Sequence, residues 1–305
     1  MTINKTAGAS SSIEGGDFYG MNAAFMATDG AKVTIKNSQV SSSAKNGNGL
    51  FSYGKGTELD AQNVTIQTTG DNSGGIQTTG GATTRAWNLN IHTTGNSAAA
   101  IRSDRGGGTY LTEGSGSPAI YSTADISASD ARLQATHSEG AVIEGKNKIA
   151  LTDCTLEGAM DATRKMGDLF YVMNTDCTIG LKGVKLTNLD AKGALLRVAG
   201  NSASRGWGTA GKNGGTAQVT TESQKLQGAI VVDTISKLDL NLGKGTDFKG
   251  TINQVENKTG EATGSIDVKV AKGATWELTG DSTVTILQNQ GKVKKNGYKL
   301  TVLSK

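Results

Sequence analysis

The side chains best suited to catalysis or metal binding are few in this chain and lie far apart. There are two histidines, His92 and His137, and neither has a metal-ligand partner at a suitable spacing. Both cysteines, Cys154 and Cys177, sit in a Thr-Asp-Cys-Thr tetrad, but the repeats described below place them in different rows. We therefore expect no disulfide, no metal site and no cofactor, and we expect Cys154 to be buried and inert.

A second kind of chemistry is suggested by a recurring phrase in which a small residue and an apolar residue precede an outward-pointing one. Gly49-Leu50-Phe51 and Ala119-Ile120-Tyr121 are examples. Side chains in a strand alternate between its two faces, so the outward residues should line one side of the molecule. The members of this predicted lateral strip are Phe51, Tyr53, Arg102, Asp104, Tyr121, Glu144, Tyr171 and Arg197.

Aromatic rings beside arginines and carboxylates suit carbohydrate binding, because rings stack on sugar faces while charged groups bond to hydroxyls. Cross-strand packing alone also favours Tyr and Phe at such positions, and both interpretations stay open. A glycosidase needs two carboxyls flanking one bond. Asp104 and Glu144 would lie two coils apart, roughly 10 Å by strand spacing. The strip therefore favours binding over catalysis, with a polysaccharide lyase or hydrolase as the alternative.

The element that must position this strip is a repeat of about 25 residues, the length of one β-solenoid turn. A second phrase keeps register with the first, as in Val33-Thr-Ile35-Lys-Asn37 and Ile149-Ala-Leu151-Thr-Asp153. Its first and third residues point inward, and its fifth is always Asn, Asp or Gly, which tolerate the left-handed backbone of a tight bend. This corner ladder is formed by Asn37, Asn63, Asn88, Asp130, Asp153 and Gly183.

The repeat predicts an all-β, right-handed, single-stranded parallel β-helix of about nine to ten coils, roughly 45–50 Å long at the spacing of paired strands. An antiparallel sandwich is the alternative, but it does not explain the aligned corner. We expect coils over residues 1–235, then C-terminal coils and a β-rich cap of the same domain over residues 236–305. Phe248 and Trp276 hold equivalent positions there and should plug the end.

The charge and hydropathy of the chain argue against two classes of protein, those that bind nucleic acid and those that span a membrane. The net charge is +4, and the dispersed charges give no basic footprint for nucleic acid. No stretch approaches 18 apolar residues, so we expect no membrane span. The first residues lack the basic and apolar regions of a signal peptide, which fits either a cytosolic protein or a secreted domain given without its leader.

Several segments resemble β-helical, adhesin-like or autotransporter-passenger-like bacterial proteins. They include NSAAAIRSDRGGGTY (96–110), GAVIEGKNKIALTDCTLEG (140–158) and WELTGDSTVTILQNQGKVKKNGYKLTV (276–302). The resemblance implies an extracellular or cell-surface location and brings no catalytic residues with it. At the level of fold alone, the chain also resembles pectin-lyase-like proteins. We expect a non-enzymatic rod that presents its strip to glycans or host macromolecules. A stalk or filament subunit that associates end to end is a further alternative.

Overall fold

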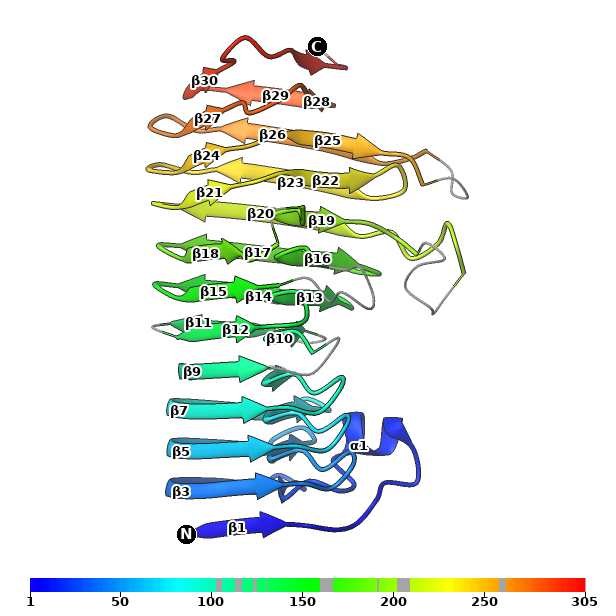
Figure 1. Ribbon diagram of the computed structural model, residues 1–305, viewed down its shortest axis with the longest axis vertical. Helices are drawn as coiled ribbons and strands as arrows, with labels where there is room; N and C mark the ends of the chain where they lie inside the picture. The colour runs from blue at the N-terminus through cyan, green and yellow to red at the C-terminus, as the bar shows by residue number, and fades with distance from the viewer. Residues whose placement is uncertain are drawn as a thin grey trace.

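The protein folds as a rod of stacked parallel strands, in a computed structural model that describes residues 1–102, 106–112, 117–122, 125–129, 131–159, 167–190, 192–201, 209–257 and 262–304 (Figure 1). Strands in successive coils pair in parallel along the whole rod. Such pairing joins each coil only to its neighbours. The predicted parallel β-helix is therefore confirmed.

The coils contribute strands to three long sheets of the rod, and the third of these sheets begins only at residue 126. Sheet A contains β1 (Thr2–Lys5), β3 (Lys32–Ser42), β5 (Glu58–Thr68), β7 (Thr83–Thr93), β9 (Gly106–Thr112), β12 (Arg132–Ala135), β15 (Thr155–Gly158) and β18 (Lys185–Asn188). Sheet B contains β2 (Phe25–Ala27), β4 (Leu50–Tyr53), β6 (Ile76–Thr79), β8 (Ile101–Arg102), β10 (Ile120–Ser122), β13 (Ala141–Glu144), β16 (Phe170–Met173), β19 (Leu196–Val198), β22 (Ile230–Asp233) and β25 (Ile252–Val255).

The third long sheet is sheet C, and shorter sheets complete the C-terminal coils. Sheet C contains β11 (Ile126–Ser129), β14 (Lys148–Thr152), β17 (Asp176–Lys182), β20 (Thr216–Glu222), β23 (Lys237–Leu242), β26 (Ser265–Val270) and β29 (Ile286–Asn289). Sheet D contains β21 (Lys225–Gln227), β24 (Asp247–Lys249), β27 (Thr275–Glu277) and β30 (Lys292–Lys294). A last pair is formed by β28 (Ser282–Val284) and β31 (Leu300–Val302).

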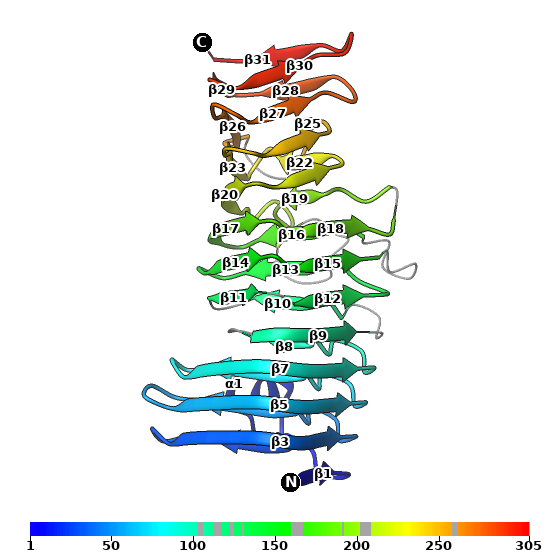
Figure 2. The ribbon, with the colours of Figure 1, turned by 90° about the vertical axis from the view of Figure 1, so that its left-hand side faces the viewer.

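The direction of the strands gives the handedness of the coil, and the strand order of sheet B gives the number of coils. In Figure 2 the strands nearest the viewer, β3, β5 and β7, run from left to right while the chain climbs toward its C-terminal end, so the coil is right-handed. The ten strands of sheet B agree with the predicted nine to ten coils. Strands β28 and β31 continue the stack beyond them, so the C-terminal segment extends the same rod (Figure 1).

The corner ladder is present where the described residues allow it to be followed. Asn37, Asn63, Asp153 and Gly183 have φ of 49°, 53°, 52° and 63°. Ser223 extends the ladder by one coil with φ of 48°, although serine was not among the expected corner residues. Asp130 lies outside the described residues. In the pairing of β7 with β9 the register shifts between Ala86 and Leu89. These two residues flank Asn88, the predicted corner of that coil.

We expect the corner at Asn63 to accept glycine and to resist a β-branched residue. Asn63→Val should cost about 1–3 kcal/mol of unfolding free energy, because a β-branched side chain is strained at positive φ. Asn63→Gly should cost less, because glycine adopts positive φ without strain, although it loses the hydrogen bond that the Asn63 side-chain amide donates to Asn37 Oδ1 at 2.9 Å. Urea denaturation of both variants measures the difference. Equal destabilisation by valine and glycine would contradict the proposed role of backbone conformation.

The core is a continuous apolar column inside the coils. Val, Ile, Leu and Ala from all the long sheets are buried in it, as the period-two pattern predicts. Cys154 and Cys177 are both buried, and the two do not form a disulfide with each other. Burial, with the charge of Asp176 in addition, raises the pKa of the Cys177 thiol to about 12. A thiol with so high a pKa stays protonated and unreactive at neutral pH.

Large rings fill the column near its C-terminal end. Phe248 and Trp276 pair in register between β24 and β27, with ring centroids 6.0 Å apart and planes at 19°. The Trp276 indole nitrogen donates a hydrogen bond to the Gly250 carbonyl oxygen at 3.1 Å, so its polar atom is satisfied although the side chain is fully buried. The two rings occupy the predicted position near the end of the rod, although β28 to β31 add strands beyond them.

Candidate binding surfaces

The predicted lateral strip corresponds to the outer face of sheet B, and its register differs from the expectation at one coil. Tyr121 pairs with Val142, and Val142 pairs with Tyr171, so Val142 occupies the place that was given to Glu144. Glu144 lies two residues further along β13 and still points away from the core. The cause is the run Val142-Ile143, in which two adjacent apolar residues leave the inward member ambiguous.

Phe51 was expected on the surface of the strip, but it is fully buried. The helix α1 (Ile13–Tyr19) lies against the outer face of sheet B, and the backbone that follows it closes over the Phe51 ring. Gly20 makes this possible, because it ends the helix at φ of 65° and a Cβ there would lie 2.8 Å from the ring. Tyr53 packs beside Tyr19, with ring centroids 5.6 Å apart.

Side chains of sheet B and its flanking turns hold residues 12–20, here called the strap, by bonding to its backbone. Asn48 donates to the Gly16 carbonyl at 3.1 Å, and Thr79 donates to the Phe18 carbonyl at 2.6 Å. Arg102 forms an ion pair with Asp17 at 2.8 Å. Burial raises the pKa of the Asp17 carboxyl, although Arg102 opposes that shift. The N-terminal half of the strip is thus covered by the chain itself.

The middle of the strip brings three predicted residues together. The Arg102 guanidinium lies 5.9 Å from the centroid of the Tyr121 ring, and the Tyr121 hydroxyl donates a hydrogen bond to the Glu144 carboxylate. All three side chains are partly exposed. Asp104 lies outside the described residues. This row has aromatic and charged groups as predicted, but those groups already bond to one another or to the strap.

The C-terminal part of the strip is also engaged internally. Tyr171 is buried in a small apolar cluster with Val142 and Met173 on the outer face of the sheet, which corrects its expected exposure. Arg197 makes two hydrogen bonds to the Asp168 carboxylate, at 2.6 and 3.2 Å. The strip is therefore largely a packing surface, in which Arg102, Tyr121, Glu144 and Arg197 each bond to another group of the molecule.

A polar groove that was not predicted lies on the outer face of sheet C. It has a volume of about 350 Å³ and spans four successive strands, β20, β23, β26 and β29. We call it the sheet C groove. The outward side chains that line it are Gln218, Thr220, Asp239, Asn241, Asp267, Lys269, Ile286 and Gln288. Amides, a hydroxyl, carboxylates and an ammonium group are thus presented side by side over consecutive coils.

The two carboxylates of the groove face each other across neighbouring coils. Asp239 and Asp267 are direct partners in the pairing of β23 with β26. Burial, together with the nearby charge of Asp239, raises the pKa of Asp267. Asp267 Oδ1 and Asn241 Oδ1 are hidden from solvent and have no hydrogen-bond partner. A signal for the pair exists in the sequence, since Leu238-Asp-Leu240 and Ile266-Asp-Val268 are aligned repeats.

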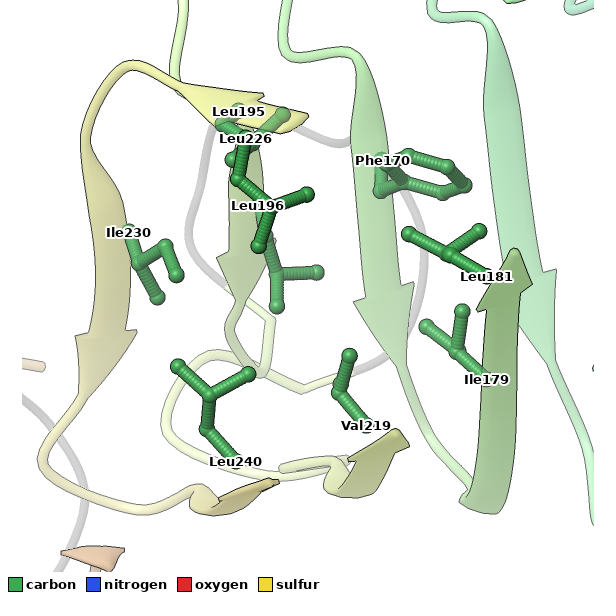
Figure 3. Close-up of a pocket in the computed structure, with 9 residues that line it drawn as sticks. All are labelled: Phe170, Ile179, Leu181, Leu195, Leu196, Val219, Leu226, Ile230 and Leu240. Atoms are coloured by element: carbon green, nitrogen blue, oxygen red, sulfur yellow. The ribbon is translucent and has the colours of Figure 1, made fainter. Parts of the chain in front are cut away.

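A second cavity lies inside the column and is wholly apolar. It measures about 20 Å³ and is lined by Phe170, Ile179, Leu181, Leu195, Leu196, Val219, Leu226, Ile230 and Leu240. Figure 3 shows these side chains coming from the surrounding strands into one space. The volume is close to that of a single water site and has no polar lining, so it is a packing gap and holds no ligand.

Filling this gap should stabilise the rod. We expect Val219→Ile to raise the free energy of unfolding by about 0.5 kcal/mol, because the added methylene improves van der Waals packing at the cavity wall. The midpoint of urea denaturation measures the change. Val232→Ile is the matched control, since Val232 is fully buried but does not line the cavity, and there the extra group should destabilise. A loss of stability from Val219→Ile would contradict the prediction.

Within the described residues, no three His, Cys, Asp or Glu side chains come together in a way that could hold a metal ion. The same part of the chain has no helix of the length and apolarity needed to cross a membrane. The fold defines a parallel β-helix protein. Comparison with known proteins adds no narrower class, since no family model, curated protein or solved structure matches the chain.

Proposed function

We propose that this chain is the rod of an extracellular or cell-surface, adhesin-like protein that binds a glycan in the sheet C groove. The observation that carries the proposal is the groove itself, in which side chains with hydrogen-bonding groups line a volume of about 350 Å³ over four coils. The resemblance to bacterial surface proteins supports the location. The predicted strip on sheet B is a weaker candidate, because Phe51 and Tyr171 are buried and Arg102 and Arg197 are paired.

The chemistry of the groove suits a polymer of sugars. Neighbouring coils lie about 4.8 Å apart, so equivalent polar side chains repeat at that interval along the rod. An extended chain of hydroxyl-bearing rings can then meet a donor or acceptor at each coil, from Thr220 through Asn241 to Gln288. Carboxylates accept hydrogen bonds from sugar hydroxyls more strongly than neutral groups do.

A glycan array followed by calorimetry tests the proposal. The intact chain should bind at least one class of oligosaccharide, and Asn241→Ala with Gln288→Ala should weaken that binding about tenfold by removing two hydrogen-bonding groups. Asn253→Ala with Gln254→Ala is the matched control, because both residues lie on β25 outside the groove. An array without hits, or equal weakening by the two double variants, would refute a glycan site in this groove.

The facing carboxylates favour glycoside hydrolysis as a second candidate function. Retaining glycosidases hold their two carboxyl groups about 5–5.5 Å apart, close to the spacing of neighbouring strands. Asp267 would then donate a proton to the leaving oxygen, and its raised pKa suits an acid. Asp239 would attack the sugar carbon, and water would release the glycan in a second step. If the unmodified chain released new reducing ends from an oligosaccharide and Asp239→Asn did not, this activity would be established. If an oligosaccharide bound to the unmodified chain but no new reducing ends formed, the activity would be excluded.

A further inference from the structure

The sheet C groove has more hydrogen-bond acceptors than donors where its walls are least exposed. Ionised carboxylates can only accept, and Asp239 and Asp267 lie directly opposite each other. Asp267 Oδ1 and Asn241 Oδ1 are shielded from water and have no partner. A shielded acceptor without a donor leaves its negative partial charge uncompensated, so these two oxygens add to the negative potential of the groove.

Positive charge is also in short supply in the groove. Lys269 is the only cationic side chain among the lining residues, and it is exposed on β26. Asp239, Asp267 and Lys269 take no part in the ion pairs found among the described residues, which join other side chains. The two carboxylates therefore repel each other without a cation held between them, and a positively charged ligand group would relieve this repulsion.

We propose that the groove selects sugars that carry a free primary amino group, as in deacetylated amino-sugar oligomers. This inference rests on the proposed glycan binding. An ammonium group offers three donors and one positive charge, so it can bridge the facing carboxylates of Asp239 and Asp267. N-acetylation removes the charge and leaves one N–H, so an acetylated oligomer meets the same acceptors with fewer donors.

The test is calorimetric titration of the intact chain at pH 6 with glucosamine oligomers and with N-acetylglucosamine oligomers of equal length. We expect the free amines to bind at least about tenfold more tightly, and we expect salt to reduce the difference. The double variant Asp239→Asn with Asp267→Asn should bind the glucosamine and the N-acetylglucosamine oligomers with equal affinity. Asp247→Asn with Glu256→Gln removes the same charge from exposed positions outside the groove and should keep the preference.

The possible outcomes separate this inference from the proposed function. Equal affinity of the unmodified chain for both oligomers would overturn the amine selectivity and leave glycan binding in place. Binding of no oligosaccharide at all would overturn both. Spermidine presents ammonium groups without sugar rings, so full competition by spermidine at equal concentration would show that charge alone is recognised and would overturn the sugar class. Circular dichroism of each variant confirms that the strands are retained.

Discussion

Trp276→Ala is expected to lower the free energy of unfolding by about 3–5 kcal/mol, the usual cost of deleting a buried aromatic side chain. The indole is fully buried near the end of the column, where it stacks on Phe248. Its removal leaves a cavity, unsupported packing on the Phe248 ring and a Gly250 carbonyl without its donor. Equilibrium denaturation in urea measures the loss.

Two further variants make this result interpretable. Trp276→Phe keeps a ring in the column and loses only volume and the 3.1 Å hydrogen bond, so it should cost clearly less than alanine. Tyr298→Ala removes an aromatic ring that is 42% exposed and should change stability by about 0.5 kcal/mol or less. If Trp276→Ala lowered the free energy of unfolding no more than Tyr298→Ala does, packing of the Phe248 and Trp276 rings would not stabilise the C-terminal end of the column.

Phe51→Ala should cost about 3 kcal/mol and leave binding in the sheet C groove unchanged. The ring has no exposed surface and lies under the strap, where the backbone of Gly20 covers it. Its loss should also loosen the strap, since the strap's other attachments to sheet B are mainly hydrogen bonds and the ion pair of Arg102 with Asp17. Thermal unfolding and hydrogen exchange of residues 12–22 measure the two effects.

Phe18→Ala is the matched control, because Phe18 belongs to the same strap but is 49% exposed. It should leave stability nearly unchanged. If Phe51→Ala instead kept the stability of the unmodified protein and lost affinity for glycans, the strip on sheet B would be the binding surface.

The column and its corners could be predicted because each inward position alternates with an outward one and each bend needs a particular backbone conformation. Val33, Ile35 and Asn37 already show both features in five residues. The period of two distinguishes the side chains that point into the core from those that point away from it. It does not show what lies against the outer side, and so Phe51 and Tyr171 were misplaced.

The cover over Phe51 could not be predicted for a physical reason. Helix α1 has only seven residues, two of them glycine, and no apolar period. It is held by tertiary bonds to Asn48, Thr79 and Arg102, which no local pattern reveals. The groove was missed for a related reason. Asp239 and Asp267 were visible as aligned residues, but the shielding of Asp267 Oδ1 and Asn241 Oδ1 depends on how four coils pack.

The parallel pairing of coils has a mechanical consequence. Backbone hydrogen bonds between coils point along the axis of the rod, and each coil bonds only to its neighbours. Tension applied to the two ends therefore loads the outermost ladder first and peels coils away one at a time. A coil of about 25 residues releases roughly 80 Å of extended chain. Single-molecule stretching should show a sawtooth of that step, and one abrupt rupture of the whole rod would contradict stepwise peeling.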